Sequence, residues 1–390
     1  MAASAVGVAQ SSSTSATVWQ MQDSGSTAGL RGIDSVDGTV AWASGTGGTV
    51  LRTTDGGVHW QKCAVPDAGT DGAALDFRGV QAWDAKTAIV MASGTGEKSR
   101  LYKTTDGCKT WTVVFKNPDV PNGFFDSVFF PRVQNLLHDH EGFGLLLGDP
   151  VNGQFSVFET RDEGYSWVRI SNDVLNASAT ESGAFAASNS CISGFGGAAF
   201  DLVIGGKAGS FLLRLSYQGH YWVNDSSKLG RTWVRKSLPM AGKNESAGPF
   251  SLAEHVSIRR NKSKTSLKSL RLYEVVVGGD YAKPGESAGT ATWSADGGEH
   301  WTASLKPPHG FRSAVQWSEA LKVWITAGTN GSDISRDDGK TWQPLDDGNW
   351  NALSLPFVVG PNGRIARLNP GAIEPKSKSV PKTADSIRRR

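Results

Sequence analysis

The chain has 390 residues, of which 38% are hydrophobic and 20% charged, and it contains 47 glycines and 14 tryptophans. This composition is typical of a turn-rich all-β protein with a sizeable core. The formal net charge of +3 arises in residues 371–390, where six basic and two acidic side chains give +4, so the rest carries 3 − 4 = −1. Nucleic-acid binding is therefore not supported, and no apolar run reaches the ~18 residues of a membrane span.

The first residues, MAASAVGVAQ, are similar to the end of a secretory signal. Because the basic start and long apolar stretch of a signal are missing, residues 1–17 are predicted to be a signal remnant or a disordered tail. We expect a periplasmic or extracellular protein, with the cytoplasm as the alternative. Cys63, Cys108 and Cys191 have no metal-ligand or CxxC spacing, so three structural thiols are expected.

The N-terminal segment 18–22 contains Trp19, the first of seven tryptophans spaced 41 to 68 residues apart. Five of the others end an eight-residue phrase with Ser or Thr first and Asp five residues before the Trp. A Gly stands three before the Trp in four of them, and Cys108 holds that position in the copy 104–111. These copies are 53–60, 104–111, 160–167, 294–301 and 335–342. A sixth copy, 226–233, has Lys228 in place of the Asp. Repeats at this period indicate an array of one supersecondary unit.

The shared residues of the Trp phrase suit a tight turn. Asp can accept hydrogen bonds from nearby backbone N–H groups, Gly can adopt a positive φ, and Trp can wedge between neighbouring sheets. We therefore predict a structural role, and neither catalysis nor metal binding, for the five aspartates Asp55, Asp106, Asp162, Asp296 and Asp337.

Each Trp phrase closes a unit of four short strands. In the first unit these are predicted at 30–36, 40–45, 49–57 and 60–62, separated by Gly turns. Four such strands form one propeller blade. The seven inner strands are predicted at 30–33, 77–80, 125–128, 181–185, 250–253, 311–315 and 350–353.

The seventh unit runs through 356–368 and ends before any Trp phrase, so it lacks its fourth strand. The segment 18–22 can supply that strand and leave no open sheet edge. The sequence therefore predicts a monomeric all-β protein, a single seven-bladed β-propeller over residues 18–370 closed by an N-terminal strand. A basic, disordered tail is expected at 371–390.

Four other motifs give weaker signals. The segment 92–99 has Glu97 where a phosphate-binding loop needs Gly, and GFGG at 194–197 precedes no helix, so no cofactor is expected. The residues from His138 to Glu141 share one loop without a distant partner, so no metal site is predicted. The insertion 259–271 has six basic residues and no acidic one; it could contact phosphate or acidic lipid, but a solvated face is favoured.

A polar residue follows the aromatic or apolar residue at each inner-strand entry. Because these entries converge on the central channel, the side chains are predicted to ring its mouth, where they either bind a ligand or only hydrate the entrance. The entry residues are Arg31, Arg78, Asp126, Ser182, Ser251, Arg312 and Asn351. Neighbouring turns add Asp149, Lys207, Asp280 and Tyr281. The three arginines are expected to bind an anionic group of a protein partner or a small anionic or glycan ligand.

The Trp phrases, the inner strands and GPNGRIARL (360–368) together resemble the photosystem II stability/assembly factor-like family of Asp-box (BNR repeat) propellers. The segments 181–188, 275–281 and 329–342 are similar to bacterial members, and the resemblance covers about residues 18–370. It implies a seven-bladed exported propeller that binds another protein during assembly of a membrane complex, and we expect a non-catalytic binder. It also implies that Arg31, Arg78 and Arg312 are the counterpart of an Arg-rich patch in the photosynthetic members.

The Asp box is shared with sialidases, so a glycan-binding or glycoside-hydrolysing propeller is the alternative. The Arg-Ile-Pro phrase of sialidases does not occur, and Arg364-Ile365-Ala366 is the nearest match. A glycosidase also needs two carboxyl groups at a fixed separation. The candidates for such a pair are Asp126, Asp149, Glu181 and Asp280.

Overall fold

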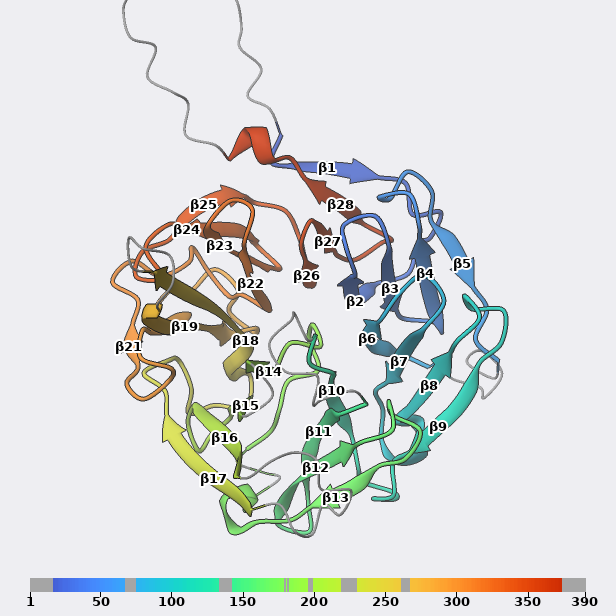
Figure 1. Cartoon of the computed structure of the whole chain (residues 1–390), viewed down its shortest axis with the longest axis horizontal. Coiled ribbons are helices and arrows are strands. Elements are labelled where there is room, and N and C mark those ends of the chain that lie inside the picture. The colour runs from blue at the N-terminus through green and yellow to red at the C-terminus, as the bar shows by residue number, and fades with distance from the viewer. Residues whose placement is uncertain are drawn as a thin grey trace, which may run out of the picture.

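The computed structural model describes residues 17–66, 75–132, 142–178, 180, 182–195, 199–218, 230–260 and 267–373. These residues form seven four-stranded antiparallel sheets arranged in a ring, and the seven-bladed propeller is confirmed (Figure 1). We number the blades from one to seven, starting with the sheet that begins at Leu30. Within the described ranges, no helix has the length and apolar character needed to span a membrane.

The four strands of each blade follow one another outward from the axis of the ring. The inner strands are β2 Leu30–Ser35, β6 Phe77–Ala82, β10 Phe125–Phe129, β14 Ile192–Phe195, β18 Ala247–Arg260, β22 Ala314–Ser318 and β26 Ala352–Ser354. The second strands are β3 Ala41–Gly45, β7 Ala88–Ala92, β11 Gly144–Val151, β15 Ala199–Ile204, β19 Leu267–Asp280, β23 Val323–Gly328 and β27 Phe357–Val359.

The third strands are β4 Thr49–Thr53, β8 Arg100–Thr104, β12 Gln154–Thr160, β16 Phe211–Gln218, β20 Ala291–Ser294, β24 Gly331–Ser335 and β28 Ile365–Leu368. The outer strands are β5 Gln61–Cys63, β9 Thr112–Lys116, β13 Val168–Ile170, β17 Gly230–Ser237, β21 Thr302–Ala303, β25 Gln343–Asp346 and, in blade seven, β1 Trp19–Gln22. Short 3-10 helices include η1 Gly96–Lys98, η3 Asp173–Leu175 and η5 Pro370–Ala372.

The N-terminal strand closes the ring, as the sequence predicts. β1 pairs antiparallel with β28, from Trp19 opposite Leu368 to Gln22 opposite Ile365 (Figure 1). The Trp19 side chain is 6% exposed, and its indole N–H donates to the Ser332 hydroxyl of blade six at 2.9 Å. Blade seven is therefore assembled from both ends of the described chain.

The core lies between the faces of neighbouring blades. Strands such as β3 are buried along their whole length because each sheet is covered on both faces. The tryptophans of the Trp phrases contribute as predicted: Trp60 packs edge-on against Phe357 of blade seven at 5.8 Å, and Trp111 against Trp42 of blade one at 6.3 Å. These rings fill the space where adjacent sheets diverge.

The turns of the five Trp phrases share one hydrogen-bond pattern, which the last copy illustrates. The Asp337 carboxylate accepts from the Thr341 backbone N–H at 2.9 Å and from the Thr341 hydroxyl at 2.6 Å. Gly339 has a φ of 81°, which glycine adopts without strain. In the first copy, hydrogen bonds from the His59 N–H and side chain lower the pKa of Asp55 to about 2. These are the capping contacts expected from the sequence; Lys228 lies outside the described residues.

Two of the three cysteines are bonded, so the prediction of three thiols is wrong. Cys63 at the end of β5 and Cys108 in the second Trp phrase form a disulfide between blades one and two, with Cα atoms 5.6 Å apart. Cys191 is free and buried. The spacing of 45 residues along the chain conceals the pair, because only the closed ring brings the outer strand of blade one to the turn of blade two.

The predicted inner strand at 181–185 is also wrong. The inner strand of blade four is β14, and Gly183 makes only an isolated bridge with Gly205. In the sequence, Phe185 resembles the aromatic residue at which the inner strands of other blades begin. It instead stacks flat on Phe250, with ring centroids 3.9 Å apart.

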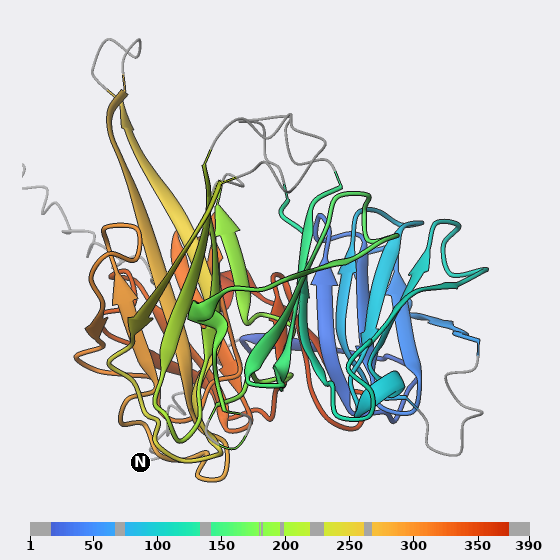
Figure 2. The same cartoon turned by 90° about the horizontal axis from the view of Figure 1, so that it is seen from below.

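The basic insertion continues two strands of blade five beyond the ring. β18 and β19 are 14 residues each and project past the neighbouring blades on the side of the Trp-phrase turns (Figure 2). Residues 261–266 lie outside the described ranges, as do 1–16 and 374–390, where the signal remnant and most of the tail are predicted. Ile373 is 4% exposed and packs with blades six and seven, so the packed core includes a residue beyond position 370.

A candidate binding cleft beside the hub of the propeller

Residues 185–190, which we call the hub segment, fill the centre of the face on which the inner strands begin. The Ser188 hydroxyl donates to the Ser313 carbonyl of blade six at 2.6 Å, and the Ser190 hydroxyl bonds to Ser251 of blade five at 2.8 Å. Asn189 bonds to backbone groups of blades two and three. A segment that bonds to four blades lies on the axis of the ring. The open channel mouth expected from the sequence is therefore occupied.

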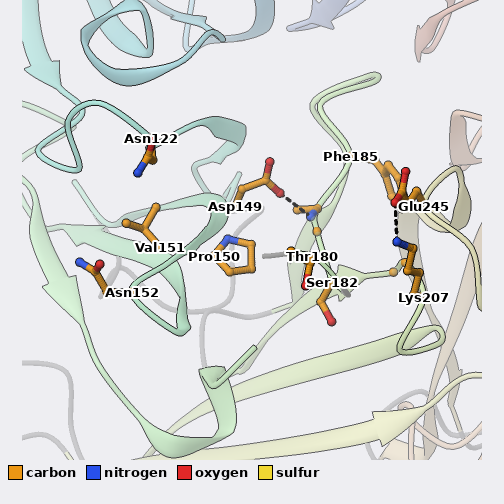
Figure 3. Close-up of a pocket in the computed structure, with 14 residues that line it drawn as sticks. Asn122, Asp149, Pro150, Val151, Asn152, Thr180, Ser182, Phe185, Lys207 and Glu245 are labelled. Carbon is orange, nitrogen blue, oxygen red and sulfur yellow. Dashed lines mark hydrogen bonds and ion pairs between the residues drawn. The ribbon is translucent and has the colours of Figure 1, made fainter. Parts of the chain in front are cut away.

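A cleft of about 460 Å³ lies beside the hub segment, between blades three, four and five. Figure 3 shows the Asp149 carboxylate among its lining residues, with the Lys207–Glu245 ion pair at one end. The lining residues are Asn122, Asp149, Pro150, Val151, Asn152, Thr180, Ser182, Gly183, Ala184, Phe185, Gly205, Gly206, Lys207 and Glu245. The cleft thus combines side chains from three predicted positions, Asp149, Ser182 and Lys207, with an edge rich in glycine and small residues.

Asp149 lines this cleft, and a second carboxyl group, that of Asp126, lies close enough to interact with it. One oxygen of Asp149 accepts the Ala184 backbone N–H at 3.1 Å. Burial raises the pKa of Asp149 to about 6. Asp126 is only 1% exposed, and its Oδ2 atom has no hydrogen-bond partner among the described residues. Burial and the nearby Asp149 carboxylate raise the pKa of Asp126 well above its ordinary value, although the Arg78 charge opposes them.

Two of the predicted arginines, Arg31 and Arg78, share one carboxylate partner, Asp76. The Arg78 Nε atom lies 2.8 Å from the Asp76 carboxylate, and the Arg31 Nε atom 3.4 Å from it. Arg78 also donates to the Ala186 carbonyl of the hub segment at 3.4 Å. The Arg78 and Arg31 side chains are 29% and 35% exposed, so each contacts both the protein and the solvent. Neither is an unpaired cation.

Arg312 does not reach the channel mouth, which corrects the predicted triad. Its side chain is fully buried, and its Nη2 and Nε atoms lie 2.5 and 2.6 Å from Asp333 Oδ2. The cause is register. Arg31, Arg78 and Asp126 each occupy a bulge at the start of an inner strand.

Blade six differs by one residue. Its first inner-strand pair is Ala314 with Ala327, so Ser313, and not Arg312, corresponds to the bulge position. Arg312 holds the preceding position, which in the other blades belongs to core residues such as Leu30 and Phe77. The signal was present in the sequence, because FRSAV is one residue longer than FRGV.

The remaining predicted residues are spread over the same face without forming one ring. Ser251 is fully buried and accepts the Val315 N–H at 2.9 Å. Asn351 donates to the Leu30 carbonyl at 2.7 Å, a link between blades seven and one. Both side chains make structural hydrogen bonds between blades and do not form part of a binding surface at the channel mouth.

Asp280 and Tyr281 lie near the cleft but do not line it. The Ser246 hydroxyl donates to Asp280 at 2.6 Å and lowers the pKa of this carboxyl. Tyr281 is 52% exposed and packs edge-on against Phe185 and Phe250. This aromatic cluster supports the hub segment from the side of blade five.

Sequence reasoning missed the residues that decide the site, namely Asn189, Asp76 and Phe185. Asn189 and Phe185 stand in a stretch that resembles an inner strand, and Asp76 directly precedes one. Glu181 and the loop from His138 to Glu141 lie outside the described residues. Across the described ranges, no three His, Cys, Asp or Glu residues are grouped so as to hold a metal ion.

The chain matches no family model and no curated protein. It is similar to solved structures that share the propeller architecture. A structure of YCF48 bound to D1 peptide has a TM-score of 0.54 and 17% identity over 90% of this chain and 97% of the other. YCF48 from Cyanidioschyzon merolae gives the same score and identity over 91% and 100%. The WD40 propeller domain of Doa1 has a TM-score of 0.50 and 11% identity over 90% and 97%. The likeness shows the fold.

Proposed function

We propose that this chain is a non-catalytic binding propeller that takes a segment of a protein partner into the cleft between blades three, four and five. The cleft itself is the observation that supports the proposal most strongly. It is an open concavity of about 460 Å³ whose lining mixes apolar residues with a few polar groups, as ligand sites do. Its glycine-rich edge at Gly183, Gly205 and Gly206 allows a partner backbone to approach closely.

Two further findings support a protein partner. YCF48, a photosystem II assembly factor, has the same fold and has been solved with a D1 peptide bound. The family resemblance in the sequence implies the same class of activity, so we propose a role as an assembly or stability factor for an exported or membrane protein complex. The Cys63–Cys108 disulfide supports export, because disulfides persist in oxidising compartments.

The alternative of a glycan-processing enzyme would depend on Asp126 and Asp149. A carboxyl that keeps its proton near pH 6 is suited to general acid catalysis. However, Asp126 is 1% exposed and cannot reach a substrate as nucleophile or base in this arrangement. Binding is therefore the function that the geometry supports better.

Site-specific photo-crosslinking tests the proposal. A photoreactive phenylalanine at Thr180, in the cleft, is compared with one at Val58, which is 72% exposed in a Trp-phrase turn on the other face. We expect a specific adduct with a host membrane or exported protein from position 180 only. Equal labelling from both positions would contradict a partner site in the cleft. Hydrolysis of a glycan panel by the unmodified protein, abolished in Asp149→Asn, would favour the enzyme.

A further inference from the structure

The three arginines that the sequence predicts to bind an anionic group all have carboxylate partners within the protein. Arg312 is paired with Asp333, and both Arg31 and Arg78 lie against Asp76. Arg312 is therefore fully paired, whereas Arg31 and Arg78 share a single carboxylate.

The Asp149 carboxylate, which lines the cleft, differs from these arginines in its pairing. No Lys or Arg among the described residues forms an ion pair with Asp149, and its second oxygen accepts no hydrogen bond from them. Lys207, the basic residue lining the cleft, is engaged by Glu245 at 2.5 Å. Figure 3 shows this pair at the end of the cleft, apart from Asp149.

A second observation concerns Asp126, which is close enough to Asp149 to interact with it electrostatically. Asp126 is buried to 99% of its surface and has an oxygen with no hydrogen-bond partner among the described residues. Unsatisfied buried acceptors are costly, and the Asp126 and Asp149 carboxyl groups repel each other when both are ionised, an effect that the Arg78 charge opposes at Asp126. A cationic group entering from solvent would reduce that cost, and an anionic group would increase it.

We propose that the cleft recognises a cationic group of the partner segment, a Lys or Arg side chain or a free amino terminus, which pairs with the open oxygen of Asp149. This inference rests on the proposed function and adds the chemistry of the anchor. The Ala184 N–H holds one oxygen of Asp149 in place, so the second oxygen is oriented in advance for a charge-assisted hydrogen bond. The aliphatic stem of a Lys or Arg would run along Pro150 and Val151.

The proposed pairing depends on pH in one direction. Because burial raises the pKa of Asp149 to about 6, the carboxyl is neutral below that value and ionised above it. Binding of a cation should therefore strengthen as the pH rises through 6. Asp126 and Cys191 interact with Asp149, Arg78 acts on Asp126, and the Lys207–Glu245 pair lies at the end of the cleft. Burial raises the pKa of the Cys191 thiol to about 12, so this group stays neutral over the range.

The test selects peptides from a random dodecapeptide phage library on the full-length protein at pH 7.5. Selected sequences are then synthesised with free and with acetylated amino termini, which separates a terminal amine from a side chain. We expect Lys or Arg to be enriched at one position. Affinity should fall by at least about tenfold in Asp149→Asn and should also fall as the pH is lowered through 6. Asp347→Asn, at a side chain that is 96% exposed, serves as the matched control and should bind like the wild type.

The outcomes separate the anchor from the site. Two outcomes would overturn the cationic anchor and leave the proposed function standing. In the first, Asn122→Trp at the cleft blocks binding of the selected peptides, but these lack a cationic position. In the second, peptides blocked by Asn122→Trp bind Asp149→Asn as tightly as they bind the wild type. If no selected peptide is blocked by Asn122→Trp and Thr180 gives no specific crosslink, both ideas fail. Unchanged melting of Asp149→Asn confirms that the variant is folded when affinity is compared.

Discussion

At the scale of single residues, the aspartates of the Trp phrases are structural caps. Partial burial alone would raise the pKa of Asp337, but hydrogen bonds from Thr341 outweigh it and hold the pKa below its ordinary value. We expect Asp337→Ala to lower the free energy of unfolding by roughly 1 kcal/mol at pH 7, as loss of a capping side chain does. Because a lowered pKa stabilises the folded state above the ordinary Asp range, the difference should shrink as the pH falls toward 3.

Urea denaturation at pH 7 and pH 3 measures this effect. Asp347→Ala is the control, since that carboxylate is 96% exposed and caps no turn. A loss of peptide binding in Asp337→Ala with an unchanged free energy of unfolding would show that the Trp phrases carry function after all.

A second residue-scale expectation concerns the buried pair of Arg312 and Asp333. Both side chains are fully buried, so removing one partner leaves an uncompensated charge in the core. We expect Arg312→Ala to lower the free energy of unfolding by about 3–5 kcal/mol. Arg31→Ala should cost less than about 1 kcal/mol, because that side chain is 35% exposed and its ion pair is screened. Denaturation midpoints that are equal in the two variants would contradict the buried pairing.

At the scale of elements, the hub segment does not pair as a strand; hydrogen bonds to several blades hold it in place. Asn189 accepts the Val128 N–H at 2.8 Å, donates to the Val80 carbonyl at 3.3 Å and has a φ of 61°. We expect Asn189→Ala to lower the free energy of unfolding by about 2–3 kcal/mol, since backbone groups of two blades lose a partner and Ala disfavours positive φ. Asn189→Gly avoids the backbone strain but still loses the hydrogen bonds, so its free energy of unfolding should lie between those of the wild type and Asn189→Ala. Wild-type stability in both variants would contradict a structural role of the hub segment.

The disulfide is the second stabilising feature at the scale of elements, and it links blade one to blade two. A bond that closes a loop of 45 residues reduces the entropy of the unfolded chain by an amount worth up to about 4 kcal/mol. We expect Cys63→Ala/Cys108→Ala to melt at a lower temperature than the wild type. A reductant should lower the melting temperature of the wild type only. Titration of one thiol in the denatured, unreduced protein checks the pairing; three thiols would exclude it.

The sequence predicts those parts of the molecule that repeat. The strands of blade one, the capping aspartates and the closure by residues 18–22 follow from local patterns that recur and so identify one another. The site was only partly predictable. A shift of one residue in blade six moves Arg312 into the core, and the hub segment imitates a strand because Phe185 stands where entry aromatics stand elsewhere. Both features depend on three-dimensional register, which no single repeat reveals.

At the scale of the whole molecule, one strand decides whether the ring is closed. β1 supplies four backbone pairs to β28, and Trp19 packs beside Trp350, with ring centroids 6.1 Å apart, while its indole bonds to blade six. Its removal would expose the edge of β28 and the buried surface of two blades. An exposed edge can pair with other chains, so both lower stability and aggregation are expected.

We therefore expect deletion of residues 1–22 to lower the melting temperature by at least about 5 °C, because the lost indole alone is worth roughly 3–5 kcal/mol in a core. Deletion of residues 1–16, which precede the described chain, is the control and should melt like the full-length protein. Trp19→Phe keeps the strand and removes the bond to Ser332, so its melting temperature should lie between the two. Calorimetry with light scattering measures both effects. If the 1–22 deletion melts like the full chain, the ring is held closed without β1, and the N-terminal strand has a role other than closure.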